Sequence, residues 1–108
     1  MCSLIPLKSN CSKALEQCIN DIHRLLAIIK DAPEFEQCSK LAHRCKDACA
    51  ECLDACESAR LDRGKMMLAC VEVCGDFAEE CGKYDGKEFR RCVASCRACI
   101  EEFENVLA

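Results

Sequence analysis

The spacing of the cysteines restricts the fold of this chain more than any other feature. After Cys2, the cysteines within each uninterrupted stretch are three, four or seven residues apart. This spacing places side chains on one stripe of an α-helix. With the register of each helix free, chance would place thirteen cysteines on such stripes roughly once in several thousand chains. We therefore predict helices whose thiols face inward.

Helix breakers are sparse and divide the chain into four similar lengths. Pro6 lies in an N-terminal tail, and turns are predicted at residues 31–34, 63–65 and 82–86. Short connections make consecutive helices antiparallel neighbours. The sequence therefore predicts an all-α fold, an antiparallel up-down-up-down four-helix bundle with a Cys-lined core, as a single domain over residues 1–108. After a tail at residues 1–8, the helices are expected at about residues 10–30, 34–62, 65–82 and 86–107.

The inward seam of each helix follows the alternation of four and three residues in a heptad. Every cysteine except Cys2 lies on a seam. The seam residues of the first two helices are Cys11, Leu15, Cys18, Ile22, Leu25 and Ile29, then Cys38, Ala42, Cys45, Cys49, Cys52 and Cys56. Those of the last two are Met67, Cys70, Cys74, Phe77, Cys81 and Tyr84, then Cys92, Cys96, Cys99, Phe103 and Val106.

Folding these seams about the three turns predicts layers of three cysteines and one apolar residue. The layers are Cys11, Cys56, Cys70 and Phe103; Leu15, Cys52, Cys74 and Cys99; Cys18, Cys49, Phe77 and Cys96; and Ile22, Cys45, Cys81 and Cys92. Toward the first and third turns, Leu25, Ala42 and Tyr84 form a layer without a thiol, and Cys38 is nearly alone beside Ile29. We therefore expect a sulfur column near the second turn and an apolar plug at the opposite end.

Charge and hydropathy exclude several classes of partner. The 15 basic residues are interleaved with 19 acidic ones for a net charge of −4, which leaves no stripe to bind nucleic acid. The longest apolar stretch, residues 25–29, is too short to span a membrane, and the N-terminus shows no basic leader. We therefore expect a cytoplasmic protein. Thiols are kept reduced there, which favours metal binding or redox chemistry over disulfides.

The thiol pattern favours monovalent copper among the soft metals. Thiolates select Cu(I), zinc and iron–sulfur clusters. Structural zinc usually takes four ligands from paired CxxC knuckles in loops, whereas the two CxxC units here lie inside helical runs. A row of Cu(I) ions with two or three ligands each would use the whole column. The candidate metal ligands are Cys11, Cys18, Cys38, Cys45, Cys49, Cys52, Cys56, Cys70, Cys74, Cys81, Cys92, Cys96 and Cys99.

A few other residues carry chemistry that copper could use. His23 and His43 each directly follow a seam residue, so we expect both on the surface. Met67 lies on a seam beside the proposed column, where a methionine is either core filler or a soft ligand. Cys2 lies off every seam and is expected to be a tail thiol.

The cysteine runs resemble those of the bacterial cytosolic copper storage proteins. The resemblance rests on Cys45-x3-Cys49-x2-Cys52-x3-Cys56, Cys70-x3-Cys74-x6-Cys81 and Cys92-x3-Cys96-x2-Cys99, and it covers most of residues 38–103. It implies a four-helix bundle, commonly assembled as a tetramer, whose core cysteines bind many Cu(I) ions. A copper chaperone would be the delivering partner. This chain departs from the family at two places. Phe77 stands where family members tend to continue the cysteine series, and residues 83–87 replace the family's His-rich third turn.

Storage of copper without catalysis is the function that these features favour. A zinc, cadmium or silver buffer, a helical protein with interhelical disulfides, and a bundle whose metal binding is vestigial or serves sensing remain as alternatives. No Glu-x-x-His pair points inward, so the ligands of a di-iron oxidase are missing.

Overall fold

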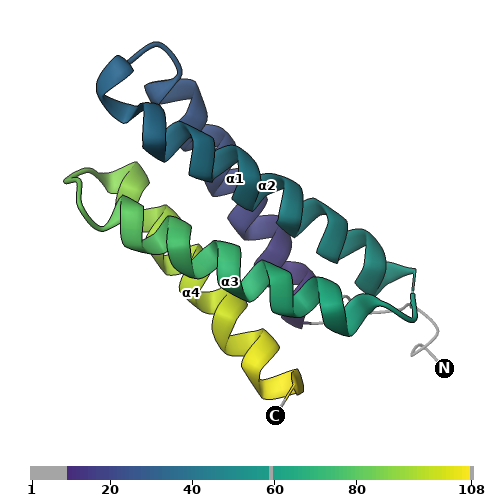
Figure 1. Ribbon diagram of the computed structural model, residues 1–108. Coiled ribbons are helices and arrows are strands. Elements are labelled where there is room, and N and C mark those ends of the chain that lie inside the picture. Colours follow the sequence, from purple (N-terminus) through teal and green to yellow (C-terminus); the bar gives the residue numbers. More distant parts are fainter. Residues whose placement is uncertain (1–9, 59, 108) are drawn as a thin grey trace, which may run out of the picture.

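The computed structural model describes residues 10–58 and 60–107. Helix α1 covers Asn10–Ile29 and is followed by a 3₁₀ turn, η2, at Pro33–Phe35. Helices α2, α3 and α4 cover Glu36–Glu57, Arg63–Cys81 and Lys87–Leu107. Each helix packs against its two neighbours in the ring α1–α2–α3–α4 (Figure 1). The predicted antiparallel four-helix bundle is therefore confirmed for the described residues.

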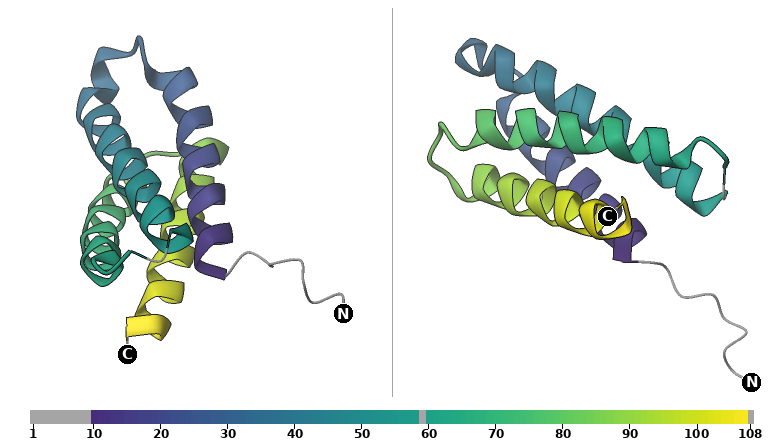
Figure 2. Two further views of the ribbon diagram at one scale, coloured as in Figure 1. Left: turned by 90° about the vertical axis from the view of Figure 1, so that its right-hand side faces the viewer. Right: turned by 60° about the horizontal axis from the view of Figure 1, so that its bottom comes forward.

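The seams account for most of the core. All predicted seam residues are buried except Cys56 and Tyr84, which are half-buried, and Val106. Val106 is 58% exposed because the end of α4 extends past the neighbouring helices (Figure 2). Leu15, Ile22, Phe77 and Phe103 fill the space between the thiols with no exposed surface. A protonated cysteine packs as a small hydrophobe, so this core is compatible with folding before metal binds.

The second connection differs from the sequence prediction. Helix α2 was expected to continue to residue 62, but it ends at Glu57, and the connection is centred on Arg60 rather than on Gly64. The guanidinium of Arg60 pairs with Asp54 at 3.3 Å and with Asp62 at 2.7 Å. Its backbone amide donates to the carbonyl of Ala55 at 3.0 Å. The chain therefore turns without a glycine or proline, and Gly64 lies within the first turn of α3.

The other two connections lie where the sequence predicts them, and both are at the opposite end of the bundle (Figure 1). Gly86 has a φ of +147°, and a Cβ atom at this position would lie 3.1 Å from the ring of Phe89. The rings of Phe35, Tyr84 and Phe89 pack together with centroids 5.0–5.4 Å apart. We call these three residues the aromatic plug. They bring both connections together at this end.

Within residues 10–58 and 60–107, no helix combines the length and the hydropathy needed to cross a bilayer.

Candidate functional site

Thiols from all four helices meet in the middle of the bundle. The Sγ atoms of Cys18 and Cys96, on α1 and α4, are 3.6 Å apart. The remaining short Sγ–Sγ distances are 3.6 Å for Cys45–Cys74, 3.7 Å for Cys49–Cys70 and for Cys70–Cys74, and 3.9 Å for Cys45–Cys96 and for Cys49–Cys74. We call these six residues the central thiol group. All six are fully buried, so a soft ion held there would be shielded from water.

Four of the described thiols form a compact cluster that could hold a metal ion. The Sγ atoms of Cys18, Cys45, Cys49 and Cys74 all lie within 4.8 Å of one another. The edge of a tetrahedral zinc–thiolate site is about 3.8 Å for Zn–S bonds near 2.3 Å. The cluster therefore approaches the span of a four-thiolate site, and its extra width also suits ions that take fewer ligands.

The predicted layers hold between some helices and are wrong between others. Cys18 and Cys96 share a layer as predicted. Between α2 and α3, however, Cys45 meets Cys74 rather than Cys81, and Cys49 meets Cys70 and Cys74 rather than Phe77. This is a shift of about one to two helical turns. It arises because the connection pivots at Arg60, closer to α2 than the predicted turn.

The same shift gives Cys38 a thiol partner. Cys38, which we expected to lie nearly alone beside Ile29, interacts with Cys81, and Cys81 also interacts with Cys92. We call these three buried residues the distal thiol group. The Sγ atom of Cys92 donates to the backbone carbonyl of Asp21 at 3.4 Å. Sulfur therefore extends closer to the aromatic plug than the sequence predicts.

The remaining cysteines extend the sulfur column toward the second connection. Cys52 interacts with Cys70 and with Cys56. Cys99 is buried and interacts with Cys18. Cys11 is 5% exposed and Cys56 is half-buried. All thirteen cysteines in the described part of the chain are free thiols.

Hydrogen bonds between the buried thiols shift their pKa values in opposite directions. The pKa of Cys74 lies far below the ordinary thiol value because Cys18 and then Cys45 and Cys49 donate to its sulfur. The pKa of Cys49 and that of Cys96 are raised, first by their hydrogen bonds to Cys18 and further by burial. A first thiolate is therefore stabilised by its neighbours' protons. Further deprotonation in this buried space requires a cation to balance the charge.

Several buried polar residues were missed by the sequence reasoning because they lie beside the seams. The carboxylate of Asp21 on α1 is 5% exposed, and it accepts hydrogen bonds from the hydroxyl of Ser95 on α4 and from Gln17 at 3.2 Å. Glu80 is 7% exposed and accepts hydrogen bonds from the Tyr84 hydroxyl at 2.8 Å and from Lys83 at 3.1 Å. The contact between Asp21 and Ser95 joins α1 to α4, whereas the contacts of Glu80 stay at the end of α3.

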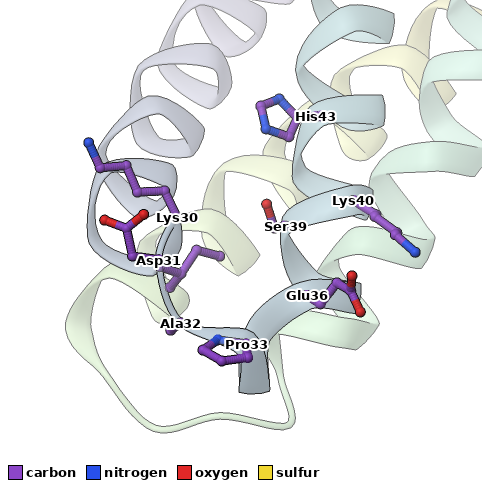
Figure 3. Close-up of a pocket in the computed structure, with 9 residues that line it drawn as sticks. Lys30, Asp31, Ala32, Pro33, Glu36, Ser39, Lys40 and His43 are labelled. Carbon is purple, nitrogen blue, oxygen red and sulfur yellow. The ribbon is translucent and has the colours of Figure 1, made fainter.

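Both histidines are exposed, as predicted. His43 lines a surface hollow of about 500 Å³ at the first connection, where Figure 3 shows it on α2 above Ser39. The hollow carries charges of both signs, from Lys30, Asp31 and others, and no sulfur. It is therefore separate from the thiol column. Cys2 lies outside the described residues.

Comparison with known proteins agrees with this arrangement. The chain is 27% identical over 71 residues to the uncharacterized cysteine-rich protein YhjQ of Bacillus subtilis (strain 168), and the alignment spans 66% of each chain. No solved structure matches it at a significant level. A family model described as copper storage protein matches residues 3–108. Since that match covers almost the whole chain, this four-helix bundle with its thiol-lined core belongs to the copper storage protein family.

Proposed function

We propose that this protein stores several Cu(I) ions per chain as thiolate complexes inside the bundle, and that it acts without catalysis. The observation that carries this proposal is the convergence of six fully buried thiols from four helices, in which the Sγ atoms of contacting pairs are 3.6–3.9 Å apart. Soft thiolates in this number favour a soft ion that needs few ligands. The proposed ligands are the thirteen described cysteines.

Anaerobic titration of the reduced protein with Cu(I), in competition with a chelator and followed by native mass spectrometry, tests the proposal. Tetrahedral zinc would saturate thirteen thiols at about three ions per chain, since each ion uses four thiolates. Cu(I) with two or three ligands should exceed that number. Saturation of Cu(I) at about three or fewer ions per chain would contradict the proposal.

A zinc, cadmium or silver buffer is the second candidate, and the cluster of Cys18, Cys45, Cys49 and Cys74 favours it. Its Sγ atoms lie within 4.8 Å, close to the tetrahedral requirement. The same titration with Zn(II), followed by addition of Cu(I), separates the two candidates. Full displacement of zinc by copper supports storage of copper, whereas retention of zinc supports the buffer.

Disulfide bonding has a separate test. The close pairs on different helices, such as Cys18–Cys96, have Sγ atoms 3.6 Å apart, well beyond the length of a disulfide of about 2 Å. We therefore expect nearly all thiols to be free in protein purified under argon. Detection of few free thiols would support the structural alternative.

We further propose, from the family resemblance, that the protein works in the cytoplasm as a homotetramer and receives copper from a chaperone. Light scattering coupled to size-exclusion chromatography measures the oligomeric state. A monomer at all concentrations would contradict the tetramer and leave the proposal for storage intact.

A further inference from the structure

A surface pocket of about 480 Å³ lies at the second connection, next to the end of the sulfur column. Its lining comes from all four helices and from the α2–α3 connection. The lining residues are Cys11, Cys56, Leu61, Arg63, Gly64, Met67, Val106 and Leu107. Three of these residues carry sulfur, and we call the hollow the sulfur pocket.

The sulfur pocket contains the most accessible thiol in the described part of the chain. Cys56 is half-buried, whereas the other twelve described cysteines are buried. Cys11 and Met67, which are 5% and 6% exposed, line the same hollow from α1 and α3. Two thiols and a thioether on three helices form a set of soft donors that solvent can reach.

A chain of sulfur contacts leads inward from this pocket. Cys56 interacts with its neighbour Cys52 on α2, and Cys52 interacts with Cys70 on α3. The Sγ atom of Cys70 lies 3.7 Å from those of both Cys49 and Cys74, which belong to the central thiol group. An ion at Cys56 can therefore move to the centre by exchanging one sulfur ligand at a time.

The opposite end of the bundle offers a poorer route. A smaller pocket of about 280 Å³ there is lined by Cys81, but this thiol has no exposed surface. Tyr84, a member of the aromatic plug, lines the same pocket, together with Asp85 and Arg90. Charged and aromatic groups are weak ligands for Cu(I) compared with sulfur.

We propose that Cu(I) passes into and out of the core through the sulfur pocket, where Cys56, Cys11 and the thioether of Met67 form an exchange site. This inference rests on the proposed storage function. The copper remains monovalent throughout. It leaves the donor's ligands, binds the sulfur of Met67 or Cys56, and displaces the thiol proton of Cys56 to solvent. At the next exchange Cys52 releases its proton, and Cys56 takes up a proton again as the copper moves on.

Stopped-flow transfer of Cu(I) from a chromophoric chelator to the reduced, full-length protein tests the inference. Met67→Leu leaves the number of thiols unchanged, so we expect an equal final copper content and an initial rate about tenfold lower. Met66→Leu is the matched control, because Met66 is half-buried next in sequence but does not line the pocket. Cys56→Ser should also load about tenfold more slowly than the unmodified protein, whereas Met66→Leu should keep the initial rate.

Pulse alkylation of the unmodified protein gives a second measurement that does not depend on variants. A brief exposure to N-ethylmaleimide, followed by peptide mass spectrometry, should label Cys56 before the other twelve described cysteines, and protein labelled at Cys56 should load copper slowly. Equal initial rates for Met67→Leu, Cys56→Ser and Met66→Leu, or labelling of Cys81 before Cys56, would overturn the exchange site while leaving storage intact. Failure of the unmodified protein to bind more than about three Cu(I) ions would instead overturn the storage function itself.

Discussion

The two ends of the bundle are lined by different kinds of side chain. At the second connection, Cys11, Cys56 and Met67 surround a solvent-accessible pocket. At the other end, the rings of the aromatic plug pack together, Tyr84 lies near Cys81 of the distal thiol group, and Cys81 has no exposed surface. One end is therefore rich in exchangeable soft ligands, whereas the other resembles the core of an ordinary helical bundle.

A thiol-lined core must be stable and must also keep some thiols accessible, and the two ends of the bundle divide these requirements between them. A cysteine buries less apolar area than a leucine, so a bundle lined with cysteine needs extra stabilisation elsewhere. The rings of the aromatic plug supply apolar contacts at the end of the bundle away from the sulfur pocket. The sulfur-rich end can then remain less tightly packed. The comparison leads to four predictions, which begin with the largest expected effect.

Copper loading should stabilise the two ends unequally. With free Cu(I) a thousandfold above its dissociation constant, binding to the folded state should add about 4 kcal/mol to the free energy of unfolding. Hydrogen exchange followed by mass spectrometry should show the strongest added protection in the parts of α2 and α3 that contain Cys45–Cys56 and Cys70–Cys74. Equal added protection around Phe35 would contradict the proposed difference.

Phe89→Ala should destabilise the copper-free protein by about 3 kcal/mol, since removing a buried phenylalanine loses apolar contacts and leaves a cavity. Phe89 is 7% exposed and packs against Phe35 and Tyr84. Chemical denaturation measures the loss. Leu68→Ala is the control, because Leu68 is 60% exposed and should change stability by less than about 0.5 kcal/mol. An equal effect of both substitutions would show that the plug does not stabilise the fold.

Two glycines at opposite ends provide a matched pair. Gly86→Ala should cost about 1–2 kcal/mol, because Gly86 has a φ of +147° and an added Cβ would lie 3.1 Å from Phe89. Gly64→Ala meets open space within the first turn of α3 and should be neutral or stabilise by up to about 1 kcal/mol. Thermal unfolding of the two copper-free variants measures both. A stabilising Gly86→Ala would contradict the described turn.

Tyr84→Phe should have the smallest effect, about 1 kcal/mol, from loss of one hydrogen bond to Glu80. That hydrogen bond holds the pKa of Glu80 below its ordinary value of 4.5. A lowered carboxyl pKa gives stability that is present above that ordinary value and is lost as the pH falls below it. The stability difference between the two proteins should therefore narrow between about pH 5 and pH 3 in denaturation experiments. A difference that is constant with pH would place Glu80 outside the interaction.

The heptad periodicity of the sequence correctly predicted the four helices, the inward direction of the thiols and the layer shared by Cys18 and Cys96. It could do so because a heptad seam is a local property of each helix. The register between α2 and α3 depended instead on where the chain turns. Arg60 stabilises that turn through ion pairs with Asp54 and Asp62. A turn of this kind contains no glycine or proline, so these residues could not reveal its position.

The heptad pattern also could not predict the polar and aromatic contacts. Asp21 and Ser95 lie on flanks of α1 and α4 that the heptad assigns to the surface, and they become buried only when those helices pack. Phe35 lies in η2, outside the expected helix seams, yet it contacts Tyr84 and Phe89. Tertiary packing decides such contacts, so local spacing alone does not reveal them.

The contact between Asp21 and Ser95 joins the first helix to the last. Together with the bond from Cys92 to the carbonyl of Asp21, it fixes how far α1 can slide along α4. A carboxylate desolvated in this way tolerates few alternative alignments, because each would leave it without its donors. The first and last helices are thereby aligned without a bound ion, and their thiols Cys18 and Cys96 are held next to each other.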